Sequence, residues 1–221
     1  RGALRFTRPD EIGAQVIKHL MKDVSQIDPK EIDDVIVGNA TPEAEQGLNV
    51  GRLVSLMGLN EIEVPGMTVN RYCSSGLETI AIADAKIKNG MGNIMLAGGI
   101  ESMSTMAMGG WRIVPHAGVA KENPTYYWGM GLTAEAVAKE YKISRDDQDT
   151  FAYQSHMKSL KAIEDGKFSD DIAPILVKRN YLDEQGKKKT TESTFTVDEG
   201  PRKGTSIEAL ARLRPVFAEG G

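Results

Sequence analysis

Three short runs that are apolar at every position constrain the fold more than any other feature of this sequence. They cover residues 35–37, 67–69 and 94–97, and segments with helical spacing of apolar residues separate them. Strands that are apolar throughout have both faces buried, and they alternate with helices in sheets that are covered on both sides. Residues 1 to about 102 therefore predict a layered α/β domain.

Cap and turn signals indicate where the helices of this domain begin and end. The segment 7–10 precedes one amphipathic run, residues 49–56 form a second, and residues 74–89 form a third that Gly90 closes. The third run is apolar almost all round, so we expect its helix to be deeply buried.

The character of the sequence changes after Ser102, which predicts a second domain over residues 103–221. Residues 102–132 are rich in methionine and glycine and have no regular period. Long irregular segments inside compact domains are usually functional. Helices are expected over 133–141, 144–165 and 206–213, and strands over 172–177 and 190–197.

Composition excludes several classes of protein. The net charge of −4, from 27 basic and 31 acidic side chains, gives no electrostatic reason to bind nucleic acid. One cysteine excludes an internal disulfide, and no spaced cluster of histidine, cysteine and carboxylate residues predicts a metal site. No apolar run reaches the roughly 20 residues that span a bilayer. We expect a cytoplasmic protein.

The single cysteine, Cys73, lies where the strand at 67–69 meets the helix that follows. The start of a helix favours an anion, and the thiolate is the nucleophilic form of cysteine. Backbone N–H groups there can also stabilise an oxyanion. Position alone leaves a second interpretation open, because free cysteines are often small apolar core residues.

Four segments, in this order, resemble the signatures of thiolases. They are Val69–Gly76 (VNRYCSSG), Gly98–Ser104 (GGIESMS), Met130–Glu135 (MGLTAE) and Leu213–Phe217 (LRPVF). The resemblance covers essentially the whole chain. It implies a layered α/β/α fold with an N-terminal domain and an inserted loop domain, and with the C-terminal half and the first strand absent.

The resemblance also implies an activity. Cys73 would take an acyl group from a 3-ketoacyl-CoA, releasing acetyl-CoA, and a second thiol would remove the acyl group; the reverse reaction is a Claisen condensation. The Cys73 N–H would form part of the oxyanion hole, and Gly76 would let backbone approach closely. No prosthetic group is implied, coenzyme A is a substrate, and the protein would be a homodimer or homotetramer. Residues 71–72 and 128–131 resemble the degradative members, which act in β-oxidation.

The sequence departs from the family in the groups that activate the nucleophile. Thiolases use a histidine in a Gly-His-Pro setting and a second cysteine, and this chain has neither. Its histidines, His19, His116 and His156, are not followed by proline. We therefore expect the second half of a thiolase to lie outside these residues, and the chain alone to be inactive.

Four residues match coenzyme A contacts of the family: Arg202 at the nucleotide end, Phe217 and Met130 along the pantetheine or adenine wall, and Ala209 at a position where some members have serine. Ordinary loop and core roles are the alternatives for these side chains. Lys187–Lys189 could attract phosphates, but a solvated hairpin tip is the simpler interpretation.

Three other functions stay open. The first is a biosynthetic acetoacetyl-CoA thiolase, and the second is a non-catalytic acyl-CoA or lipid-binding module on the same fold. The third is a ketoacyl synthase, which also uses a cysteine at a buried helix start. Saturable dependence on coenzyme A would separate the synthase, and a downstream Gly-His-Pro segment with a second cysteine would separate the binding module.

Overall fold

The computed structural model describes residues 2–221 and packs them as two compact units. One unit contains the residues up to Ile113 together with Ala173–Thr196, and the other contains Val114–Ile172 and Val197–Gly221. The domain division between residues 102 and 103 stays a prediction. The hairpin that the sequence analysis placed in the second domain packs within the first unit.

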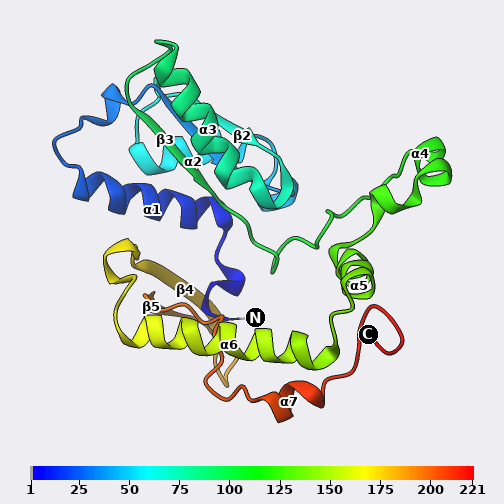
Figure 1. Cartoon of the computed structure of the whole chain (residues 1–221). Coiled ribbons are helices and arrows are strands. Elements are labelled where there is room, and N and C mark those ends of the chain that lie inside the picture. The colour runs from blue at the N-terminus through cyan, green and yellow to red at the C-terminus, as the bar shows by residue number, and fades with distance from the viewer. Residues whose placement is uncertain (1) are drawn as a thin grey trace. The chain divides into compact units, whose positions relative to one another are not determined.

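The first unit is built on a parallel sheet of β1 (Asp34–Gly38), β2 (Gly66–Val69) and β3 (Met95–Gly99). The strand order is β2-β1-β3, and Val35 lies opposite both Gly66 and Leu96 (Figure 1). These strands confirm the three apolar runs and the α/β class.

Helices cover both faces of the central strand β1. Side chains at alternate positions of a strand point to opposite faces. Val35 and Val37 pack on one face with residues of α1 (Pro9–Asp23) and α2 (Val50–Leu59). On the other face, Asp34 pairs with Lys86 of α3 (Ser75–Lys88), and Gly38 lies against the first residues of that helix.

The prediction that α3 is deeply buried is wrong for this chain. Only Ser75, Thr79 and Ala83 are buried, which is a narrow stripe of small residues with helical spacing. Leu77 is 71% exposed and Ile80 is 57% exposed. The error arises because apolar composition shows what a helix tends to bury, and the described residues supply cover for only one side of it.

The hairpin of the first unit consists of β4 (Ile175–Leu182) and β5 (Lys188–Phe195), which are antiparallel. Gln15 of α1 joins it to the helical layer: its Nε2 donates to the Leu176 carbonyl at 3.2 Å, and its Oε1 accepts from the Leu176 N–H at 2.8 Å. Lys187–Lys189 are exposed beside the turn, which supports the interpretation as a solvated hairpin tip.

The second unit contains α4 (Ala117–Glu122), α5 (Met130–Tyr141), α6 (Arg145–Glu164) and α7 (Ile207–Ala211). A capping box of Ser144 and Asp147 begins α6, as the sequence predicts. Hydrogen bonds from the Ser144 hydroxyl and N–H hold the pKa of Asp147 below its usual value. Helix α5 begins at Met130, three residues before the predicted start.

Short turns of 3-10 helix connect these elements. They cover Ala3–Phe6, Pro29–Glu31, Ala44–Gln46, Tyr72–Ser74, Pro124–Tyr127 and Ser169–Asp171. Helix α4 and the turn at Pro124–Tyr127 lie inside the segment 102–132, which the sequence predicts to be irregular.

Candidate functional site

Cys73 lies on an exposed loop between β2 and α3. It is the middle residue of the 3-10 turn Tyr72–Ser74, and α3 begins two residues later at Ser75. The predicted position at the joint between strand and helix is therefore where the structure places it, one short turn ahead of the α-helix itself. Its thiol is open to a reagent from solution.

The loop holds Tyr72 in an unusual backbone conformation. Its φ is +46°, in the left-handed region that residues with a side chain seldom adopt. The Tyr72 N–H donates to Asn70 Oδ1 at 2.9 Å, and the Tyr72 carbonyl accepts from the Ser75 hydroxyl at 2.6 Å. The sequence analysis gave Asn70 and Ser75 no role. An asparagine two residues before the residue whose N–H it accepts is a known turn signal, and it could have identified Asn70.

The N–H of Cys73 is free to meet a ligand. Among the hydrogen bonds of residues 2–221, none uses this group as a donor. Arg71 beside it forms an ion pair with Glu78, with 3.0 Å between Nε and Oε2. The geometry is therefore compatible with an oxyanion site at the Cys73 N–H.

The glycine that packing requires near this loop is Gly38 rather than Gly76. A Cβ added at Gly76 meets nothing within 4 Å in the described part of the chain. A Cβ added at Gly38 would lie 2.7 Å from the carbonyl carbon of Ser75 and 2.9 Å from the Gly76 nitrogen. The close backbone approach that we expected at Gly76 is thus found at the end of β1, where the start of α3 rests on it.

The second signature segment packs at the same end of β1. The Glu101 carboxylate accepts from the Ala40 N–H at 2.6 Å, from Asn39 Nδ2 at 3.4 Å, and from the Gln46 side chain. Gln46 is fully buried, and its Oε1 accepts from the Ser102 N–H at 3.0 Å. The residues that follow β1, β2 and β3 therefore lie at one edge of the sheet.

Two of the predicted coenzyme A contacts lie together in the second unit. Met130 is the first residue of α5 and is 64% exposed. The ring of Phe217 packs on Gly131, the next residue, so closely that an added Cβ would lie 2.3 Å from ring carbons. Phe217 is itself 58% exposed, so both side chains keep a free apolar surface.

The other two predicted contacts belong to segments that α6 holds. The Arg202 N–H donates to His156 Nδ1 at 3.2 Å, which ties its loop to that helix. Ala209 is exposed on α7, and Arg145 of α6 donates to the carbonyl oxygens of Leu210 and Leu213 at 2.7 and 3.0 Å. Helix α6 is therefore the common support of both segments.

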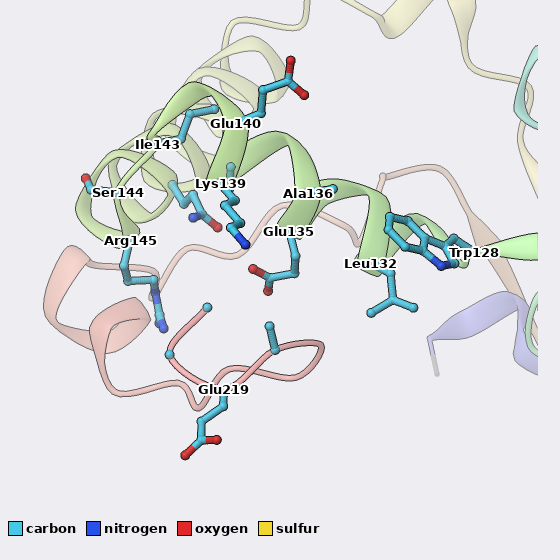
Figure 2. Close-up of a pocket in the computed structure, with 15 residues that line it drawn as sticks. Trp128, Leu132, Glu135, Ala136, Lys139, Glu140, Ile143, Ser144, Arg145 and Glu219 are labelled. Atoms are coloured by element: carbon cyan, nitrogen blue, oxygen red, sulfur yellow. The ribbon is translucent and has the colours of Figure 1, made fainter. Parts of the chain in front are cut away.

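A cavity of about 950 Å³ lies in the second unit, between α5, the start of α6 and the last four residues. Glu135, Lys139 and Arg145 are directed towards it, whereas Glu140 points away (Figure 2). Its lining mixes both signs of charge and includes none of Met130, Arg202, Ala209 and Phe217. This cavity therefore gives no reason to assign it to coenzyme A.

Each histidine has a structural contact. His19 lies 3.8 Å from Asp23 on α1, His116 caps α4 by accepting from the Val119 N–H at 3.3 Å, and His156 accepts from Arg202. Within residues 2–221 there is no group of histidine, cysteine and acidic side chains placed to hold a metal ion. No helix in this range has the length and apolar character needed to cross a membrane.

The first unit defines a class of protein: layered α/β proteins that present an accessible thiol between a parallel strand and the helix that follows. Comparison with known families identifies the class further, because the model of the thiolase N-terminal domain matches residues 1–221. The chain belongs to the thiolase family.

Individual relatives agree with this assignment. The chain is 44% identical over 221 residues to a 3-ketoacyl-CoA thiolase of Bacillus subtilis (strain 168), and 36% identical over 234 residues to a probable acetyl-CoA acyltransferase of Staphylococcus aureus (strain COL). Each alignment covers 100% of this chain and 56% of the relative.

A solved structure shows the same fold. The crystal structure of the Bacillus anthracis acetyl-CoA acetyltransferase superposes with a TM-score of 0.81 at 33% identity, covering 99% of this chain and 55% of the other. The chain thus has the N-terminal fold of thiolases and spans about half the length of the relatives it matches.

Proposed function

We propose that this chain supplies the acyl-accepting thiol of an acetyl-CoA acyltransferase and that Cys73 is that thiol. The observation that carries the proposal is the exposed Cys73, two residues before α3, inside a loop whose residues match the nucleophile motif of the family. The free Cys73 N–H supports it further, because acyl transfer needs a donor for the developing oxyanion.

The proposed reaction cleaves a 3-ketoacyl-CoA in two steps. The Cys73 sulfur attacks the 3-keto carbonyl, and the bond between carbons 2 and 3 breaks. The electron pair of that bond takes a proton and leaves as acetyl-CoA, so a shortened acyl group stays on Cys73 as a thioester. The thiol of free coenzyme A then attacks this thioester, giving the shortened acyl-CoA and the free cysteine.

Coenzyme A is the second substrate in this proposal, and the second unit binds it. Met130 and Phe217 offer neighbouring apolar surfaces for the pantetheine arm or the adenine ring. The Arg202 guanidinium suits a phosphate, because its fork of donors matches phosphate oxygens. Ala209 offers a methyl group where a serine would offer a hydrogen bond. No prosthetic group is needed.

The degradative direction is supported by the relatives. The 44% identity is to a protein named for 3-ketoacyl-CoA, whereas the acetyl-CoA acetyltransferase structure is 33% identical. We accordingly propose a role in fatty-acid β-oxidation, in the cytoplasm, as a homodimer or homotetramer. The biosynthetic reaction, condensation of two acetyl-CoA molecules, is the second candidate, since that structure carries the name of such an enzyme.

The proposal includes groups that this chain does not hold. The histidine and second cysteine that activate the nucleophile in the family would come from the C-terminal half of the fold. We call a polypeptide that contains these residues and that half the complete enzyme. The 221-residue chain by itself is expected to be inactive.

The test is acetylation of the complete enzyme by acetyl-CoA, followed by peptide mass spectrometry. An acetyl group on the peptide that contains Cys73, and none in the variant Cys73→Ala, is the expected result. Label on another residue, or binding of coenzyme A without any label, would favour a non-catalytic binding module. Turnover of a 3-ketoacyl-CoA longer than acetoacetyl-CoA separates the degradative enzyme from the biosynthetic one.

A further inference from the structure

The strained conformation of Tyr72 needs a cause outside the residue itself. Its φ of +46° is sterically unfavourable, and its side chain is 73% exposed, so packing of the ring does not enforce the conformation. Backbone strain of this kind persists only where the surroundings hold it, and it gathers at functional sites.

Two side chains hold the peptide groups on either side of the Tyr72 Cα. Asn70 accepts from the Tyr72 N–H at 2.9 Å, and its Nδ2 donates to the Ala40 carbonyl at 3.1 Å. Ser75 donates to the Tyr72 carbonyl at 2.6 Å and accepts from the Arg71 N–H at 2.8 Å. We call this pair of side chains the Asn70–Ser75 clamp.

Both members of the clamp are anchored to the same strand. Ser75 is only 4% exposed and lies against Gly38, the last residue of β1. Asn70 reaches Ala40, two residues further along the chain. The position of the loop is therefore set by β1, whose residue Ile36 has no exposed surface.

We propose that Asn70 and Ser75 are positioning residues for acyl transfer at Cys73. The Tyr72 carbonyl and the Cys73 N–H belong to one planar trans peptide group, so holding the carbonyl also fixes the direction of the N–H. The clamp thereby aims the oxyanion donor before the substrate arrives, which is the preorganisation that such a donor requires. This inference rests on the proposed function.

The experiment compares two reactions of the same thiol in the complete enzyme. Asn70→Ala and Ser75→Ala should each slow acetylation of Cys73 by acetyl-CoA by roughly 5- to 30-fold, the population cost of releasing a strained left-handed residue. Alkylation of Cys73 by iodoacetamide forms no oxyanion, and its rate should change little in the same variants. A merely structural defect would change both rates together.

Two further variants complete the design. Glu78→Gln removes the ion pair with Arg71 beside the loop and leaves the clamp intact, so it should acetylate at close to the unaltered rate. Tyr72→Gly added to Ser75→Ala should recover part of the lost rate, because glycine adopts positive φ without steric cost. Circular dichroism and thermal unfolding establish that each variant is folded.

The outcomes separate this inference from the proposed function. If the unaltered enzyme is acetylated at Cys73 and both clamp variants match its rate, the clamp is refuted and the proposed function stands. The clamp is also refuted if acetylation and alkylation fall by equal factors, or if Tyr72→Gly restores nothing. If the unaltered enzyme is not acetylated, the proposed function and the clamp fail together.

Discussion

Replacing Gly38 with alanine should strain the contact on which the Cys73 loop rests. The new Cβ would lie 2.7 Å from the Ser75 carbonyl carbon, 2.9 Å from the Gly76 nitrogen and 2.9 Å from the Ser75 Cβ. Ordinary contact begins at 3.4 Å, so the start of α3 would have to move by about 0.7 Å relative to β1. Two of these three contacts are backbone atoms, which cannot swing aside as a flexible side chain can.

Overpacking of this kind costs about 1 to 3 kcal/mol. With a urea dependence of about 2 kcal/mol per molar, the unfolding midpoint should fall by roughly 0.5 to 1.5 M. In the complete enzyme, a shift of this size at the nucleophile should also slow acetylation of Cys73 by about tenfold or more, since misplacement by about 1 Å can cost about a hundredfold.

The assay is urea unfolding followed by circular dichroism, with Gly204→Ala as the matched control. A Cβ at Gly204 meets nothing within 4 Å among the described residues, so this variant should unfold within about 0.5 kcal/mol of the parent. If Gly38→Ala unfolds at the same urea concentration as Gly204→Ala, the close approach of α3 to β1 is wrong. The account of how the loop is positioned would then lose its basis.

Three further predictions concern the second unit. Arg202→Ala should raise the KM for coenzyme A more than it lowers kcat, and the reverse pattern in steady-state kinetics would remove Arg202 from the binding site. Arg145→Ala, which removes the donors that hold α7 and the partner of the buried Asp149, should cost about 2 kcal/mol and speed proteolysis of residues 197–221; unchanged cleavage would contradict this. Ser144→Ala should cost about 1 kcal/mol through loss of the helix cap. Because Ser144 lowers the pKa of Asp147, the stabilisation from that carboxylate is present above its ordinary value of 3.8 and is lost as the pH falls through the lowered pKa. The pKa of Asp147 should therefore rise in Ser144→Ala, and an unchanged NMR titration would oppose this assignment.

The strands and most helices could be predicted because their causes are local. The runs at 35–37, 67–69 and 94–97 are apolar on both faces, which few structures other than a covered strand accommodate. The capping box at Ser144 uses side chains three residues apart, so its signal is complete within one turn of helix. For such features the pattern and its physical cause lie in the same stretch of chain.

The exposure of α3 could not be predicted, because burial depends on what packs against a helix. Its buried stripe of Ser75, Thr79 and Ala83 is made of small residues that suit a close approach to a strand. Leu77 and Ile80 on its other sides would be read as core from composition alone, yet they are exposed. The sequence shows the capacity for burial on all sides, and only tertiary structure shows which side is used.

The position of Cys73 was predictable from sequence, whereas the support of its loop was not. A cysteine between a strand and a helix is visible in the printed residues, and so is the family motif around it. The left-handed Tyr72 depends on Ser75, which in turn depends on Gly38, thirty-seven residues earlier in the chain. The requirement for glycine therefore appears in β1 rather than in the motif. An acyl-accepting loop that is referenced to a fully covered strand needs no contact of its own to keep its shape, which explains how Cys73 can be both exposed and fixed.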